Sequence, residues 1–129
     1  MIDVAYVQRM SRYNRWQNEN LYDVADRLSE AERRKERGAF FGSIHNTLSH
    51  LLWADHLWMS RFAGWPKPEG GIPQSVSLFP EWENLKAERK DSDARLIDWA
   101  DTLDPKWIKS DMTWFSGAIN REVTKPHWQ

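Results

Sequence analysis

The stretch FGSIHNTLSHLLWADHLWMSRF, residues 41–62, decides the fold class of this 129-residue chain. It holds no Pro or Gly after Ser43, and the Ser43 hydroxyl can cap a helix by accepting a hydrogen bond from a free backbone N–H. Apolar residues recur at the three- and four-residue steps of one helix face: Ile44, Leu48, Leu51, Trp58 and Phe62. Other apolar side chains widen this stripe until the middle is apolar nearly all round. The stretch predicts a helix from Ile44 to about Phe62 that is buried on several sides and ends at Gly64.

The segments before and after this stretch predict two more long helices. The first runs from about Ala5 to Ser29, with a stripe at helical spacing that is apolar except for Gln17: Met10, Tyr13, Gln17, Leu21, Val24 and Leu28. The charge-dense residues 30–37 that follow are expected to form a solvated connection. Residues 64–80 are rich in Pro and Gly and predict a long crossover or a functional flap. Pro80 suits the first turn of a third helix. Its mainly apolar stripe keeps helical spacing to about Asp104-Pro105, where Pro ends it: Trp82, Leu85, Arg89, Leu96, Trp99 and Leu103.

The C-terminal residues predict a small β-hairpin and the opening of a fourth helix. Residues 112–123 consist of Met112 to Phe115, then Ser116-Gly117-Ala118, then Ile119 to Val123, as in a small hairpin. Thr124-Lys125-Pro126 has Pro where a first helical turn favours it. We therefore expect a single all-α domain over residues 1–129. Its fold would be a four-helix bundle of up-down type, with a long crossover, a small hairpin and a truncated last helix.

Composition narrows the function classes. The 18 Lys and Arg residues and the 19 Asp and Glu residues nearly cancel, so the formal net charge is −1. This balance leaves no excess of positive charge that would indicate binding to nucleic acid or to an anionic membrane surface. The N-terminus lacks the basic and apolar regions of a secretory signal, so we expect a cytoplasmic protein. Because the chain contains no Cys, disulfides, thiolate metal sites and a cysteine nucleophile are excluded. The nine Trp residues are expected to serve mainly in core packing.

The histidines are the residues with the clearest chemical potential. His45, His50 and His56 share one predicted helix, but His45 and His56 lie about 16 Å apart along its axis and His50 points elsewhere. No pair has the spacing for a local metal site. His50 is the candidate ligand because its apolar neighbours favour the neutral, metal-binding form of imidazole. The alternative is a core histidine bonded to a carbonyl or to a Trp N–H. His45 and His56 are expected to face solvent or to cap, and Asp55 to be a hydrogen-bonded acid on the buried face.

Three segments resemble the DinB family, whose name comes from DNA-damage induction: residues 13–18, residues 41–50 and residues 54–58. The resemblance implies a four-helix bundle of the DinB/YfiT type that is commonly a homodimer. It also implies a divalent metal, Ni, Zn or a similar ion, held by three histidines. Related branches use this metal to activate a low-molecular-weight thiol for transfer to a small-molecule substrate.

Carried over to this sequence, the resemblance matches His50 to the first metal ligand. The family's other two ligands form an H-x-x-x-H pair in the last helix, and this sequence contains no such pair. Residues 125–129 resemble the entry to that helix, and His127 matches neither ligand. Either the natural chain continues, which we favour because a shortened last helix would leave apolar faces uncovered, or the site has been lost. Two functions stay open: a metal-dependent thiol-transferase or detoxification enzyme, and a non-catalytic metal-binding or dimeric bundle.

Overall fold

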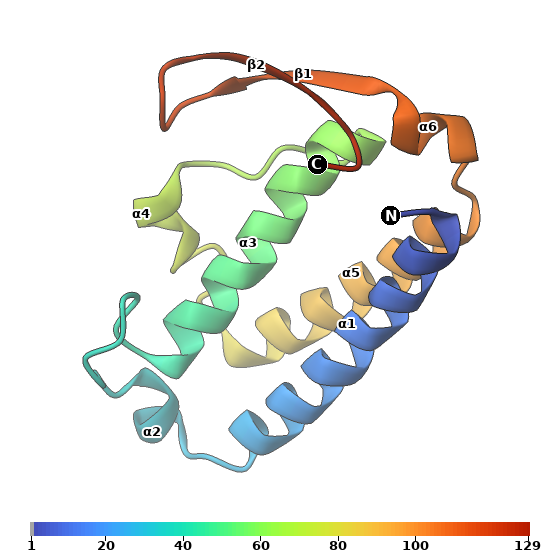
Figure 1. The fold of residues 1–129 in the computed structure, drawn as a ribbon. Helices are drawn as coiled ribbons and strands as arrows, with labels where there is room; N and C mark the ends of the chain where they lie inside the picture. The colour runs from blue at the N-terminus through green and yellow to red at the C-terminus, as the bar shows by residue number, and fades with distance from the viewer. Residues whose placement is uncertain (1) are drawn as a thin grey trace.

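The computed structural model describes residues 2–129, which form a mainly helical fold with one small sheet (Figure 1). Three helices are long: α1 (Val4–Asp26), α3 (Ile44–Ala63) and α5 (Trp82–Asp101). The short helices are α2 (Glu30–Arg34), α4 (Ile72–Ser75) and α6 (Pro105–Lys109), and the strands are β1 (Asp111–Ser116) and β2 (Arg121–Pro126). The helical fold class is therefore confirmed for residues 2–129. The four-helix arrangement is not, since only three long helices occur in that range.

Helix α3 follows the sequence prediction closely. The Ser43 hydroxyl accepts a hydrogen bond from the Asn46 backbone N–H at 3.1 Å, and Gly64 ends the helix in the left-handed region with φ of 68°. Glycine suits this position because it adopts positive φ without the cost that a side chain adds. Most of the helix is buried or half-buried. Its N-terminal half contributes Leu48 and Leu52 to a core that also contains Tyr22, Ala25, Trp82 and Leu85.

Helix α1 packs along α5 with a different face from the one predicted. Figure 1 shows the two helices side by side and running in opposite directions. The predicted apolar stripe is exposed: Met10 by 40%, Tyr13 by 45%, Leu21 by 53% and Val24 by 58%. The inward face instead carries Asn14, Asn18, Tyr22 and Ala25. The apolar periodicity predicted the wrong face because α5 offers buried charged groups that α1 meets with polar side chains.

The connections contain more structure than the sequence predicts. Residues 30–37 begin with α2, whose Arg33 is buried and lies 4.7 Å from the Trp82 ring centroid. The crossover contains α4. Pro80 lies before the third long helix rather than in its first turn, because Glu81 is the N-cap. That helix ends at Asp101, and Pro105 begins α6 instead of terminating α5.

The C-terminal hairpin is confirmed, but the predicted opening of a fourth helix is wrong. Thr124, Lys125 and Pro126 belong to β2, where they pair with Thr113, Met112 and Asp111 of β1. Cross-strand pairing competes with the weak local preference of this segment for a helix, and Pro126 is tolerated because it occupies the end of an edge strand. The hairpin lies across the C-terminal end of α3 (Figure 1). Among the described residues, no helix is long and apolar enough to cross a membrane.

Candidate functional site

The candidate site is centred on His50, which α3 holds beside the crossover. Its imidazole is half-buried and stacks on Phe41, with ring centroids 3.9 Å apart and planes inclined by 23°. Trp53 lies on the same helix with its ring centroid 5.7 Å from that of His50. Burial lowers the pKa of His50 below the ordinary histidine value of 6.5. The ring is therefore neutral at pH 7, which is the form that can ligate a metal or accept a proton.

Ser75, at the end of α4, determines which nitrogen of His50 carries the proton. The Ser75 hydroxyl donates to the Ile72 carbonyl at 2.6 Å, and His50 Nδ1 lies 2.8 Å from the same hydroxyl oxygen. A hydroxyl has one proton, and the carbonyl can only accept. Nδ1 must therefore donate to Ser75, which leaves the lone pair on Nε2. The backbone carbonyl of Ser75 accepts a further bond from Ser49 at 2.7 Å, so α4 is anchored to α3 at two points.

His45 is not solvent-facing, which corrects the sequence prediction. It is fully buried, and its Nε2 lies 2.9 Å from the Phe79 carbonyl oxygen, so this nitrogen donates. Its Nδ1 is buried without a hydrogen-bond partner. Burial lowers the pKa of His45, and the hydrogen bond to the Phe79 carbonyl opposes this shift. Its observed role is to join α3 to the crossover.

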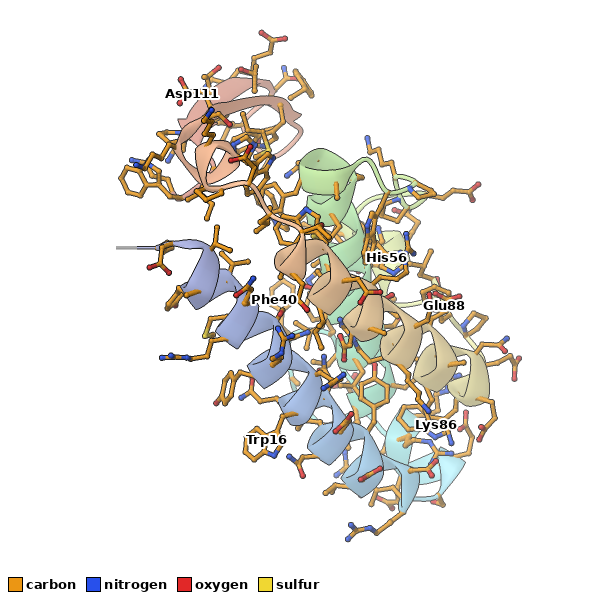
Figure 2. All side chains as sticks on the ribbon, turned by 90° about the vertical axis from the view of Figure 1, so that its right-hand side faces the viewer. Trp16, Phe40, His56, Lys86, Glu88 and Asp111 are labelled. Carbon is orange, nitrogen blue, oxygen red and sulfur yellow. The ribbon has the colours of Figure 1, made fainter. Side chains whose placement is uncertain are left out.

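His56 is likewise half-buried rather than exposed. Its Nε2 lies 2.8 Å from the Ser92 hydroxyl on α5, and its ring makes an edge contact with Trp65. Burial lowers its pKa as well. Figure 2 shows His56 beside the α3 ribbon. His56 therefore links the two helices.

His127 lies at the end of the hairpin and is held by aromatic packing. Its ring stacks on Trp107 with centroids 3.9 Å apart, and its Nδ1 lies 2.8 Å from the Ser110 carbonyl oxygen. Residues 2–129 contain no group of three or more His, Asp or Glu side chains that could hold a metal ion. The three-histidine centre that the family resemblance implies therefore does not fit the described residues. His50 is a single candidate ligand.

A buried charged network between α1, α3 and α5 was not predicted from the sequence. Arg89 Nη2 lies 2.6 Å from a carboxylate oxygen of Asp55 and 2.6 Å from one of Asp93. The amides of Asn14 and Asn18 donate to Asp93 at 3.0 Å each. Arg89 and Asp93 are 4% and 2% exposed, whereas the Asp55 side chain is 38% exposed. Asp55 is hydrogen-bonded as predicted but less buried.

The sequence contains one indication of this network. Arg89 lies on the apolar stripe of the third predicted helix, with Asp93 one turn later. A buried arginine requires acidic partners, and this spacing places one on the same face. The amide partners on α1 could not be identified in this way, because their face follows from the packing of α1 against α5.

Comparison with known proteins identifies one family. The sequence model of the DinB family matches residues 1–127. No curated protein and no solved structure matches the chain.

Proposed function

This chain belongs to the DinB family, and on that premise we propose that it contributes His50 to a divalent metal centre of a thiol-transferase or related detoxification enzyme. The observation that carries the proposal is the hydrogen bond of His50 Nδ1 to Ser75, which directs the lone pair to Nε2. Histidines that bind metals are commonly oriented by such a bond through the other ring nitrogen. His50 is the one ligand proposed within residues 2–129, because no group of three or more His, Asp or Glu side chains there could hold a metal ion.

The proposed metal is Ni, Zn or a similar divalent ion, and a metal of this kind can shift a bound thiol toward its thiolate. The chain has no Cys, so the thiol would come from a small cofactor. To this centre the described part of the protein would contribute the neutral ring of His50, which the aromatic side chains of Phe41 and Trp53 flank.

The test of the metal centre measures the metal that the protein retains when it is desalted after incubation with Ni²⁺ or Zn²⁺. We expect His50→Ala to lose the bound metal and His127→Ala, which removes an imidazole in another environment, to retain it. Ser75→Ala should weaken metal affinity by about tenfold to a hundredfold, because the Nδ1 proton loses its acceptor. Equal metal content in wild type and His50→Ala would contradict the proposal.

The activity test follows the loss of bacillithiol, mycothiol or glutathione in the presence of metal-loaded protein and an electrophilic acceptor. We expect turnover that disappears in His50→Ala while the far-ultraviolet circular dichroism is unchanged. Absence of turnover with all three thiols, in a protein that retains its metal, would favour the second function below.

The second candidate function is that of a non-catalytic, dimeric helical protein. The apolar side chains on the outer face of α1 favour it, because Trp16 is 59% exposed and Leu21 is 53% exposed. Figure 2 shows Trp16 directed away from the α1 ribbon. Large exposed apolar patches are typical of interaction surfaces.

Sedimentation of wild type and of a Trp16→Ser/Leu21→Ser double variant tests this surface. We expect a homodimer for the wild type and a monomer for the double variant. The matched control, Glu19→Gln, changes a polar residue of α1 and should remain dimeric. A monomeric wild type at high concentration would exclude this function.

A further inference from the structure

The C-terminal hairpin separates its charges between its two faces. In the antiparallel pair, Met112 lies opposite Lys125 and Ser116 opposite Arg121, so these four side chains share one face. This face lines a pocket together with residues of α3. The acidic residues of the two strands, Asp111 and Glu122, alternate onto the opposite face. The pocket face of the hairpin therefore carries two cations and no carboxylate.

The other wall of this pocket comes from the C-terminal end of α3. Trp58 and Phe62 are one turn apart on the helix and line the pocket with Trp114 of β1. The Trp58 and Trp114 rings meet edge to face with centroids 5.6 Å apart. Arg61 lies over both rings, 4.6 Å from the centroid of Trp58 and 5.6 Å from that of Trp114. The wall is therefore aromatic and bordered by a third cation.

None of these three cations has an acidic partner. Among the described residues, Arg61, Arg121 and Lys125 form no ion pair with any carboxylate. Within residues 2–129, no Asp or Glu side chain lines the pocket, and the one carboxylate near it is that of the Gln129 main chain, which forms no ion pair with the three cations. Burial lowers the pKa of Arg61 without a carboxylate to oppose it. Arg121 and Lys125 are exposed at the edge of the pocket, and two cations beside aromatic walls create a local positive potential that attracts an anion.

We propose that this pocket, between the hairpin and the end of α3, binds a small planar aromatic carboxylate. Its volume of about 400 Å³ is within the range of small-molecule sites and too small for a macromolecule. The aromatic walls would contact the ring of the ligand, and Arg121 and Lys125 would bind its carboxylate. Arginine can hold a carboxylate through two parallel hydrogen bonds. Trp58 lies eight residues after His50, about 12 Å along the helix axis, so this site is separate from the proposed metal ligand.

Calorimetric titration of the 129-residue chain with 2-naphthoate tests the proposal, and neutral 2-naphthamide is the matched ligand control. We expect 2-naphthoate to bind, and the amide to bind at least about tenfold more weakly because it lacks the charge. Affinity for the acid should fall as ionic strength rises. Arg121→Gln and Lys125→Gln should each weaken the binding of the acid by about tenfold, which corresponds to the loss of one charge-assisted contact.

Two control variants separate this site from general charge effects and from unfolding. Glu122→Gln changes the opposite face of the same strand, and Lys90→Gln removes an exposed cation from α5. Both should bind 2-naphthoate as the wild type does. In ¹H–¹⁵N spectra, the indole N–H signals of Trp58 and Trp114, assigned by Trp→Phe variants, should shift on titration of the wild type.

Three results would overturn the proposal. The first is equal affinity for the acid and the amide. The second is unchanged affinity in both Arg121→Gln and Lys125→Gln. The third is the absence of binding to folded wild-type protein at millimolar 2-naphthoate. Because no metal is needed for this titration, its outcome is independent of the function proposed for His50.

Discussion

Arg89 places a charged side chain inside the protein, where it is only 4% exposed. Its guanidinium group is almost fully buried between the carboxylates of Asp55 and Asp93. Burial acts to lower the pKa of Arg89, but the two carboxylates outweigh it and the pKa is raised. The group therefore stays charged inside the protein. Asp93 in turn needs Arg89 as its cationic partner, because both side chains are removed from water.

We expect Arg89→Leu to destabilise the fold strongly, because it leaves the Asp93 carboxylate buried without its cation. Removing one member of a buried pair costs about 3–5 kcal/mol. Urea unfolding followed by circular dichroism measures this cost. The control is Arg12→Gln, which breaks the exposed pair with Asp101 and should leave the free energy of unfolding nearly unchanged. Equal midpoints for the two variants would show that the buried network does not stabilise the protein.

His45 predicts a loss of stability in acid. Burial holds its pKa in the folded protein below the ordinary value of 6.5. As the pH falls below that value, the unfolded chain binds a proton at this residue and the folded protein does not. The free energy of unfolding therefore decreases below about pH 6.5, and His45 contributes no pH dependence above it.

Urea midpoints measured between about pH 8 and about pH 5 test this expectation. In His45→Gln the side-chain amide can still donate to the Phe79 carbonyl but does not titrate, so the decline in acid should be shallower than in the wild type. Part of the decline should remain, because burial also lowers the pKa of His50 and His56. An identical decline in both proteins would assign the effect to other groups.

At the scale of elements, local signals determine where helices begin and end. Ser43 and Gly64 mark the ends of α3 in the sequence as they do in the structure. These signals are predictable because a cap hydrogen bond and a positive φ involve only a few neighbouring residues. The hairpin was also predictable from its two short runs around Gly117.

Features that depend on distant partners could not be predicted in the same way. The inward face of α1 is polar because Asn14 and Asn18 meet Asp93, which lies more than seventy residues later. Thr124 belongs to a strand because it pairs with Thr113. For the site, the sequence indicated His50 as the candidate ligand. Its hydrogen bond to Ser75 depends on the fold of the crossover, so the sequence could not indicate which nitrogen is free.

Ser43→Ala tests the cap of α3. Its hydroxyl accepts from the Asn46 N–H, so we expect a loss of about 1 kcal/mol in the free energy of unfolding. Ser77→Ala is the control, since this exposed hydroxyl bonds only to the Gln74 carbonyl nearby. The midpoint of thermal unfolding should therefore be lower in Ser43→Ala than in Ser77→Ala. A wild-type midpoint in Ser43→Ala would mean that the start of α3 is determined by packing alone.

At the scale of the whole molecule, the charge balance predicts weak interaction with nucleic acid. The net charge of −1 arises from mixed signs, and no run of Lys and Arg forms a stripe. We expect no salt-dependent binding to duplex DNA near physiological ionic strength. A gel-shift titration measures this, with a basic DNA-binding protein as the positive control. Micromolar binding that weakens steeply with added salt would contradict the expectation.

The polar contacts between α1 and α5 also determine the register in which the two helices meet. Gln8 reaches the Ala100 carbonyl, Asn14 and Asn18 reach Asp93, and Lys86 reaches Asp26. Sliding α1 by one turn, about 5.4 Å, would separate all of these donors from their acceptors at once. A purely apolar seam would oppose such a slip only through the fit of its side chains, because hydrophobic contact has no direction. The helix pair therefore has one alignment, and any variant that makes this seam apolar gains freedom to misalign.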